Sequence, residues 1–380
     1  AQQERTERVA QQIWEFAELG YLETRSSGLL VDELQREGFS IRQGVAEIPT
    51  AFVAEWGEGG PVIGLLAEFD ALPGINQSSA PTRDPVAGKH AGHACGHNLF
   101  GAGSLSAAIA IRNWLEATGT PGRVRLYGTP AEEGGSGKVY MARAGLFDDA
   151  DFVIDWHPAD RNSAASRKSL ANRSGKFRFR GVSAHAAGAP ERGRSALDGV
   201  EAMNMMVNMM REHTSMDTRI HYVITDGGKA PNVVPDFAEV FYYVRHSDAD
   251  EVRALWPRIE AAAKGAAMGT GTEVDWEIIH GNNPTLPLQS LQLMMDGKLR
   301  SLEPIEYTAD ELEWAVTIRE SLGEDAPELA QAQQVEDYAV LTGYGSTDVG
   351  DVSRAVPTVS VRTATWVPGT AAHSWQAVAA

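Results

Sequence analysis

Residues of the types that bind transition metals are gathered in a few short segments of this sequence. Gly92–Asn98 contains one cysteine and two histidines, and the adjacent acidic residues Glu132 and Glu133 are followed by two glycines. Asp155–Pro158 and Thr370–His373 each add one more histidine. Thiolate, imidazole and carboxylate groups are the protein ligands of zinc and related metals. The candidate ligands are Cys95, His97, Glu133, His157 and His373.

Five candidate ligands are more than one closed tetrahedral site needs, and they suit two divalent ions that share a bridging ligand. Such a pair of ions activates water for hydrolysis, and Glu132, next to a ligand, is placed to act as general base and acid. Taken alone, Cys95 would be interpreted as a small buried apolar residue and the acidic pair as part of a solvated loop. The nearby histidines favour a metal site, with zinc or manganese expected and cobalt or nickel also compatible.

The size and charge of the chain limit the alternatives. A chain of 380 residues is expected to form two domains. The formal net charge is −18 and there is no basic run, which argues against nucleic acid or an anionic membrane as a partner. No segment approaches the ~20 apolar residues of a membrane helix. One cysteine excludes an internal disulfide, and the N-terminus lacks the layout of a signal peptide, so a cytoplasmic protein is expected.

Strands and helices alternate along the first part of the sequence, and candidate site residues follow the strands. The predicted strands cover residues 51–56, 62–67, 124–128 and 152–155, and the predicted helices cover 4–18, 25–38 and 103–118. Ser26 or Ser27 is the expected cap of the second helix. Glu132 and His157 come just past the ends of two strands. Because ligands of an open α/β sheet bind at the carboxyl ends of its strands, the pattern predicts an α/β catalytic domain with its site there.

From about Arg173 to His280 the order changes to strand, helix, strand, strand, helix, strand. This order resembles a ferredoxin-like split unit, with two helices on one face of an antiparallel sheet. A methionine-rich stretch in its first helix is interpreted as core packing. That stretch comprises Met203, Met205, Met206, Met209 and Met210. The predicted domains are a catalytic metal-binding domain at residues 1–172 and 285–380, and an inserted domain at residues 173–284.

Nine segments, in order, resemble a known family: the two-domain metallohydrolases that include aminoacylases, carboxypeptidase G and plant auxin-conjugate hydrolases. These segments are Leu66–Leu72, Gly96–Leu99, Glu132–Lys138, Trp156–Pro158, Ala184–Ala187, Gly193–Asp198, Pro231–Val234, Ser346–Ser353 and His373–Gln376. The resemblance runs along nearly the whole chain. It implies an α/β metal-binding catalytic domain with an inserted ferredoxin-like α+β domain that serves as a dimerisation domain and lid.

The resemblance also implies roles for individual residues. The five candidate ligands match the family's metal ligands, and Glu132 matches its general base and acid. Asp70 matches an aspartate that orients a metal-binding histidine two residues earlier, where this chain has Glu68. His185 matches a residue that reaches across a homodimer to hold the scissile carbonyl of the partner's substrate. The residues that match those binding the free α-carboxylate of the substrate are Asn232 and Arg245.

Without the resemblance, two of these residues would be interpreted differently. His185 would be a loop histidine with its hydrogen bonds satisfied, and Arg245 would pair with Glu239 or Asp248 on the surface, where ion pairs contribute little. The resemblance also implies a further segment after the last histidine motif, whereas this chain ends seven residues after His373. A ligand so near the end of a chain is expected to be loosely held.

Together these features predict a metal-dependent amidohydrolase with two divalent ions per subunit, acting as a homodimer on a small-molecule substrate. The bond to be cleaved is the amide between an acyl or aroyl group and an amino acid with a free carboxylate. Within the family, the motifs favour p-aminobenzoyl-glutamate, a folate breakdown product. The alternatives are hydrolysis of other N-acyl amino acids, such as indole-acetyl or dipeptide conjugates, and a non-catalytic binding or regulatory subunit that kept the fold. The complete ligand set and Glu132 argue against that last alternative.

Overall fold

A computed structural model describes residues 2–380, and the chain in it forms two compact units. Unit 1 consists of Ala1–Lys168, Thr285–Thr342 and Asp351–Ala380, and unit 2 consists of Ser169–Pro284 and Gly343–Gly350. All candidate metal ligands lie in unit 1, together with Glu132 and Asp70. The candidate substrate-binding residues lie in unit 2.

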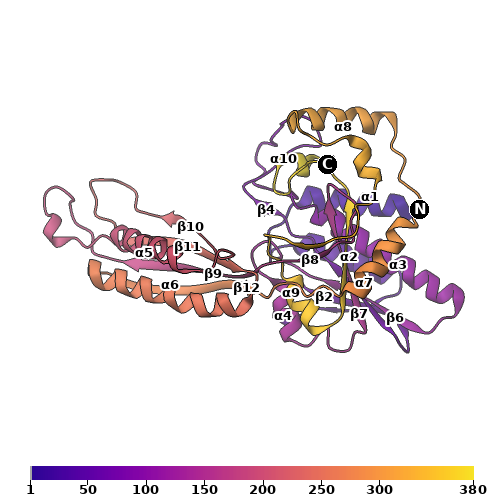
Figure 1. The fold of residues 1–380 in the computed structure, drawn as a ribbon, viewed down its shortest axis with the longest axis horizontal. Helices are drawn as coiled ribbons and strands as arrows, with labels where there is room; N and C mark the ends of the chain where they lie inside the picture. Colours follow the sequence, from indigo (N-terminus) through magenta and orange to yellow (C-terminus); the bar gives the residue numbers. More distant parts are fainter. Residues whose placement is uncertain (1) are drawn as a thin grey trace. The chain divides into compact units, whose positions relative to one another are not determined.

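Unit 1 is built on a six-stranded mixed sheet with the strand order β1-β2-β6-β3-β7-β14. The labels β2, β6 and β7 mark part of this sheet in Figure 1. The strands are β1 (Ser40–Gln43), β2 (Phe52–Glu58), β6 (Gly122–Gly128), β3 (Val62–Ala67), β7 (Phe152–Ala159) and β14 (Thr358–Ala364). The last four are parallel to one another, whereas β1 and β2 are antiparallel to their neighbours. The parallel strands bring their carboxyl ends to one edge of the sheet, and the predicted α/β class is confirmed.

Three helices pack on this sheet and form the main core of unit 1. They are α1 (Gln2–Phe16), α2 (Thr24–Arg36) and α3 (His97–Thr118). Their buried side chains Ile13, Leu30 and Leu105 share one apolar cluster with Leu65 and Leu126 of the sheet. The other α-helices are α4 (Gly137–Arg143), α7 (Gln289–Arg300), α8 (Ala309–Ser321), α9 (Val349–Ala355) and α10 (Trp375–Ala379). The short helices are η1 (Val45–Glu47) and η4 (Leu329–Gln333). Two small sheets pair β4 (Leu72–Pro73) with β5 (Ala91–Gly92) and β8 (Ser166–Lys168) with β13 (Val340–Thr342).

The start of α2 differs from the prediction. The helix begins at Thr24, so Ser26 and Ser27 lie inside its first turn and neither is its cap. The carboxylate of Glu18 takes over the capping function, because it accepts hydrogen bonds from the backbone N–H groups of Arg25 and Ser26 at 3.1 and 2.9 Å. A side chain six residues upstream thus satisfies donors that the sequence pattern assigned to a serine.

The start of α3 and the end of β7 also differ from the prediction, and each difference places a histidine inside a regular element. α3 begins at His97 and not near residue 103, because Gly96 adopts a left-handed conformation, with φ of +74°, that turns the chain directly into the helix. A Cβ atom at Gly96 would lie 2.6 Å from Cβ of Pro158, so a side chain would not fit there. β7 continues to Ala159, and His157 therefore lies within the strand and not beyond its end.

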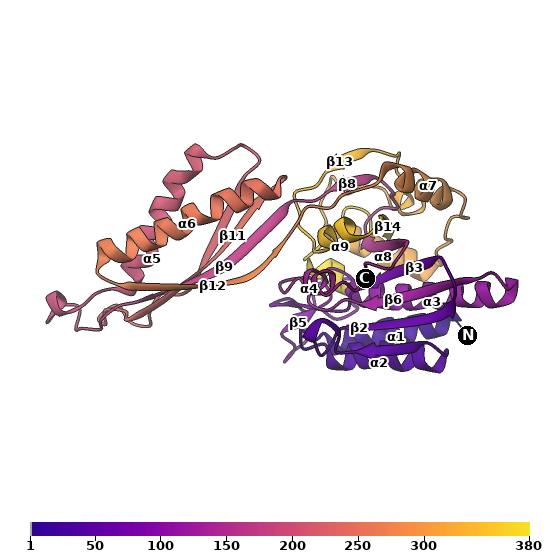
Figure 2. The ribbon, with the colours of Figure 1, turned by 90° about the horizontal axis from the view of Figure 1, so that it is seen from below.

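Unit 2 has the predicted order of elements around a four-stranded antiparallel sheet. The elements are β9 (Ala171–Arg180), η2 (Pro190–Arg192), α5 (Ala196–Met210), η3 (Arg211–His213), β10 (Arg219–Asp226), β11 (Phe237–His246), α6 (Ala249–Thr270) and β12 (Glu273–Asn282). The strand order is β10-β11-β9-β12, the arrangement of a ferredoxin-like split unit. Both helices lie on one face of the sheet (Figure 2). There Val200 and Trp256 share an apolar core with Phe177 and Val240.

The methionine-rich stretch of α5 is mostly not core, contrary to the prediction. Met203 is fully buried and Met210 packs against the core, but Met205, Met206 and Met209 are 60%, 41% and 64% exposed. The helical period explains the difference, since residues at Met203 and four positions later face the sheet while the other three methionines lie on the outer side. Unit 2 therefore carries an exposed apolar stripe of Met205, Met206 and Met209, here called the methionine face.

Candidate metal centre

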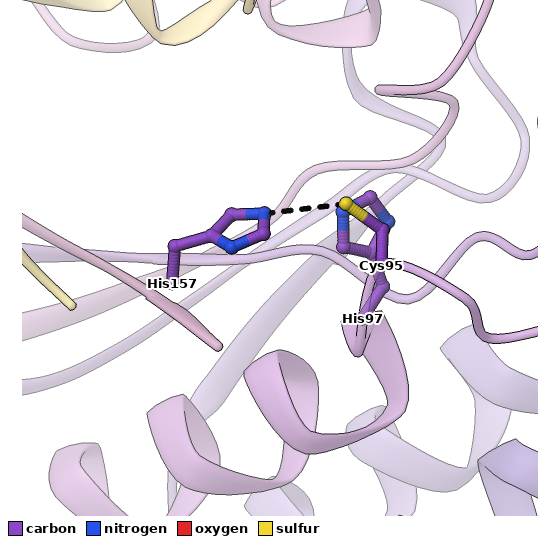
Figure 3. Close-up of side chains that lie close together, drawn as sticks. All are labelled: Cys95, His97 and His157. Carbon is purple, nitrogen blue, oxygen red and sulfur yellow. Dashed lines mark hydrogen bonds between the residues drawn. The ribbon is translucent and has the colours of Figure 1, made fainter. Parts of the chain in front are cut away.

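The candidate ligands converge in unit 1, beginning with Cys95, His97 and His157. One ligand atom of each lies within 4.8 Å of the other two (Figure 3). Sγ of Cys95 is 3.6 Å from Nε2 of His157, and the rings of His97 and His157 stand edge to face with centroids 5.7 Å apart. The residues come from the loop before α3, from the first turn of α3 and from β7. The start of α3 and the distant strand β7 thus present sulfur and nitrogen ligands to one point.

A second group contains Cys95, Glu133 and His373, again with one ligand atom each within 4.8 Å. Nε2 of His373 is 3.4 Å from Oε1 of Glu133. Cys95 belongs to both groups, which is the position expected of a ligand that bridges two ions. The backbone of His373 is in the left-handed region, with φ of +63°, and its N–H donates to the carbonyl oxygen of Ala94 at 2.8 Å. This hydrogen bond ties the last ligand to the segment that carries the first.

The chain end after His373 is packed, although the imidazole of His373 itself is 54% exposed. Ser374 caps α10 by accepting a hydrogen bond from the backbone N–H of Ala377. Val378 and its neighbours are buried, and the indole N–H of Trp14 in α1 donates to the carbonyl oxygen of Val378 at 2.7 Å. Burial and this hydrogen bond outweigh the tendency of a terminal segment to fray.

His97 is held by a carboxylate at each ring nitrogen. Its Nδ1 lies 2.8 Å from Oδ1 of Asp70, and its Nε2 lies 2.9 Å from Oε2 of Glu68. The other oxygen of Asp70 accepts a hydrogen bond from the backbone N–H of Glu133 at 2.9 Å. Asp70 therefore contacts a histidine after all, but one that lies 27 residues later in the chain.

The buried polar atoms of this cluster fit divalent ions. Nε2 of His97, Oε2 of Glu68 and Oε1 of Glu133 are sealed from solvent without a hydrogen-bond partner, although each has another ligand atom close by. Such atoms are costly unless something compensates them. Burial raises the pKa of the Cys95 thiol to about 12, so the thiolate requires a cation beside it. The sulfur and nitrogen atoms in this set favour a transition metal over magnesium or calcium.

The pKa values of His157 and His97, the two histidines of the first group, are shifted in opposite directions. Burial lowers the pKa of His157 to about 4, so its imidazole is neutral and ready to bind a metal. Burial alone would also lower the pKa of His97, but the carboxylates of Glu68 and Asp70 outweigh it and raise this pKa well above the usual value. A divalent ion at Nε2 of His97 would therefore replace the proton that the two carboxylates favour on this ring.

Glu132 lies in a third group, with Glu68 and His97, in which one atom of each residue is within 4.8 Å of the others. The loop that carries it turns sharply, because Ala131 has a φ of +59°. The N–H of Ala131 donates to Oε1 of the fully buried Glu23 at 2.8 Å. A partly buried carboxylate beside the ligand cluster is suitably placed for proton transfer.

In unit 2, His185 and Asn232 lie on neighbouring segments and are both exposed. The N–H of Ala186 donates to the carbonyl oxygen of Asn232 at 3.0 Å, next to a bridge that pairs His185 with Val233. Nδ1 of His185 faces the backbone N–H groups of Ala187 and Gly188 at 3.2 and 3.0 Å. An imidazole nitrogen that accepts hydrogen bonds carries no proton, so the proton of neutral His185 is on Nε2, which can donate.

Arg245 lies on β11, and its guanidinium is 5.4 Å from the ring centroid of Tyr243. Glu239, one of the two acidic residues considered as a surface partner of Arg245, pairs with other residues. Its carboxylate accepts a hydrogen bond from Arg178 at 2.8 Å and lies 3.4 Å from Nζ of Lys176. Arg245 is opposite Arg219 in β10 and Asn172 in β9, on the sheet face that the two helices leave open.

Residues 64–377 match the model of peptidase family M20/M25/M40, which is most of the chain. The chain belongs to this family. It is 38% identical to one of the subunits of p-aminobenzoyl-glutamate hydrolase from Escherichia coli (strain K12), and the match covers all of this chain and 84% of that protein. It is 32% identical to Xaa-Arg dipeptidase of Mus musculus, with 93% of this chain and 75% of that protein covered.

A solved structure of a dinuclear metal-binding peptidase of the M20 family from Bacillus subtilis superposes with a TM-score of 0.63. The identity is 17%, and 98% of this chain and 91% of that chain are covered, so this likeness supports the M20 fold. The related proteins are hydrolases and dipeptidases, and the predicted class of metal-dependent amidohydrolase is confirmed at the level of the family. Among the described residues, 2–380, no helix is long and apolar enough to cross a membrane.

Sequence reasoning assigned no role to three buried residues around the centre of this M20 protein, although it noted Glu68 at the position of the family's histidine. Lys138 and Glu68 form an ion pair with Nζ and Oε1 2.6 Å apart, and Glu23 supports the turn at Ala131. Lys138 stands only five residues after Glu133, which is the single sequence signal that could have drawn attention to it. Charged residues are normally exposed, so a sequence alone gives no reason to place these three inside.

Proposed function

We propose that this protein uses two divalent ions to hydrolyse the amide bond of N-acyl or N-aroyl amino acids with a free carboxylate. The observation that carries the proposal is the convergence of five ligand side chains from distant segments, with Glu132 beside them. The 38% identity to the p-aminobenzoyl-glutamate hydrolase protein of Escherichia coli supports p-aminobenzoyl-glutamate, a folate breakdown product, as the preferred substrate. Zinc or manganese is the proposed metal.

The residues of unit 1 supply the hydrolytic chemistry. Cys95, His97, Glu133, His157 and His373 would hold the two divalent ions, which when bound would lower the pKa of water and polarise a carbonyl group. Glu132 takes a proton from the attacking water as its oxygen bonds to the carbonyl carbon. When the C–N bond breaks, Glu132 returns that proton to the leaving nitrogen, so the products are a free acid and an amine.

The residues of unit 2 supply recognition in this proposal. His185 donates from Nε2 to the carbonyl oxygen as negative charge develops there, in agreement with the proton position that its backbone contacts require. Asn232 and the guanidinium of Arg245 bind the free carboxylate of the substrate, since charge-assisted hydrogen bonds are the stronger ones. We propose further that two chains form a homodimer through the methionine face, and that His185 serves the site of the partner chain. Exposed apolar stripes of this kind mark association surfaces.

A substrate panel on the metal-reconstituted protein tests the proposal. We expect turnover of p-aminobenzoyl-glutamate to exceed that of indole-acetyl-aspartate, benzoyl-glycine and Xaa-Arg dipeptides. Higher kcat/KM on dipeptides would favour the second candidate, for which the 32% identity to Xaa-Arg dipeptidase is the supporting observation. Two bound ions without turnover of any of these amides would support the non-catalytic role instead. Glu132→Gln serves as the control for contaminating activity.

A further inference from the structure

Lys138 is an unusual residue to find beside a metal centre. It lies in α4, just after the loop of Glu132 and Glu133, and its side chain is 0% exposed. Its Nζ is 2.6 Å from Oε1 of Glu68, whose side chain is 1% exposed. Lysine and glutamate are almost never fully buried, and a buried ion pair costs desolvation that mutual attraction seldom exceeds. Stability alone is therefore a weak reason for this pair.

The position of the second oxygen of Glu68 explains the buried Lys138–Glu68 pair better than stability does. Oε2 lies 2.9 Å from Nε2 of His97. Neither atom is exposed to solvent and neither has a hydrogen-bond partner, so this short approach is not a hydrogen bond. Nδ1 of His97 is already occupied by Asp70, which leaves Nε2 as its ligand atom. An ion bound by His97 would satisfy Nε2 and Oε2 together.

The pair thus forms a chain of contacts that runs from a buried cation to a ligand atom. Lys138 contacts one oxygen of Glu68, and the other oxygen of Glu68 faces the ligand nitrogen of His97. Glu68 and His97 also form a candidate ligand group with Glu132. Without the contact to Lys138, the carboxylate of Glu68 would be free to rotate away from Nε2 of His97.

We propose that Lys138 is a positioning residue that holds Glu68 by Oε1 and directs Oε2 to the ion at His97, so that Glu68 is a sixth, carboxylate ligand. This inference rests on the proposed two-ion site. Its consequence is that the ion at His97 is bound by an additional oxygen, whereas the second ion is not. Lys138 itself touches neither the substrate nor the ions, and its fixed charge offsets that of the added carboxylate.

The test compares metal binding by the metal-free wild-type protein with that of the double variant Glu68→Gln/Lys138→Met. This variant replaces the ion pair with uncharged side chains of similar volume, so it should fold with a similar melting temperature. We expect one of two Zn²⁺ ions to bind at least ~10-fold more weakly in competition with a chromogenic chelator, a typical loss for a changed ligand environment. The visible spectrum of the Co²⁺-loaded protein should also change, because it reports ligand number and geometry.

Two further variants keep the test decisive. Glu68→Asp retains the charge but withdraws the carboxylate from His97, so it should weaken the same ion even if the double variant does not fold. Arg125→Met, which removes a buried arginine paired with the partly exposed Glu55 and Asp149 elsewhere in unit 1, should lower stability and leave metal affinity unchanged. Wild-type affinity for both ions with an unchanged Co²⁺ spectrum in Glu68→Asp, or in a folded double variant, would overturn the inference. Failure of the wild type to bind two ions would instead overturn the proposed function.

Discussion

The candidate ligands of unit 1 and the candidate recognition residues of unit 2 are held in different ways. In unit 1, His97 is buried and has a carboxylate at each ring nitrogen, and Asp70 in turn holds the backbone of Glu133. In unit 2, His185 and Asn232 are exposed and are held only through backbone hydrogen bonds. Ligands that are fixed by surrounding side chains are pre-organised, whereas exposed residues depend on what binds to them. We therefore expect metal binding to be a property of one chain and turnover to depend on assembly.

The largest expected effect comes from Glu132, the unit 1 residue that the proposal assigns to proton transfer. Glu132→Gln should lower kcat by about 10² to 10⁴, because the amide cannot take the proton from water. Metal content, measured by atomic emission, should remain at the wild-type level. Activity within a few-fold of wild type would remove Glu132 from the mechanism.

His185→Ala tests the exposed recognition residues of unit 2. The loss of one hydrogen-bond donor to the developing oxyanion should lower kcat by about 10² to 10³ without loss of metal. Because the proposal places His185 in the partner's site, mixing this variant with Glu132→Gln should restore activity. Each mixed dimer then has one site with both residues intact.

The size of the recovery follows from the statistics of exchange. Random exchange gives half mixed dimers with one working site each, so activity should approach roughly a quarter of wild type if the sites act independently. Two different affinity tags verify that exchange has occurred. Verified mixed dimers without recovered activity would show that His185 serves its own chain or no site, and the contrast between the two units would then not reflect assembly.

Much of the ligand set was accessible from the sequence, because strand ends and metal-binding residue types coincide. β3 has the predicted bounds, and the five candidate ligands lie in two groups of close side chains that share Cys95. What the pattern missed depends on tertiary contacts. Nothing in the sequence places Lys138 inside, since its burial follows from the pairing with Glu68 across distant segments. The exposure of Met205 was also missed, because apolar character does not reveal which helix face meets the sheet.

Cys95 offers a finer test within unit 1. Its pKa of about 12, raised by burial, means that the metal-free protein carries a protonated thiol at pH 8, and metal binding must release this proton. Cys95→Ser should therefore reduce the proton release on Zn²⁺ binding by about one proton per site, measured calorimetrically in buffers of different ionisation enthalpy. His90→Gln, a change at an exposed residue just before β5, should have no effect. Equal proton release in Cys95→Ser and wild type would show that Cys95 is not a ligand.

The smallest expected effect concerns stability and Glu23, which supports the turn before Glu132. Burial, with a further contribution from Asp70, raises the pKa of Glu23 to about 7. The folded protein therefore binds a proton that the unfolded chain, with an ordinary pKa of 4.5, has released. Stability from this group is fully present below about pH 4.5 and is lost as the pH rises through about 7.

Glu23→Gln should remove this pH dependence while keeping the local contacts. Glutamine can still accept the N–H of Ala131, and its amide can donate to the hydroxyl of Thr50, which reverses the direction of a 3.0 Å hydrogen bond. At pH 8 the variant should be more stable than wild type by up to about 3 kcal/mol, and near pH 4.5 the two should be similar. Urea unfolding of the metal-free proteins across this range measures the difference. Glu18→Gln should act in the opposite sense, because backbone hydrogen bonds from Ser26 and Arg25 outweigh burial and lower the pKa of Glu18, so the stability it contributes is lost as the pH falls. An unchanged pH slope in Glu23→Gln would mean that Glu23 is ionised in the folded protein, and that the turn before Glu132 is supported by a charge.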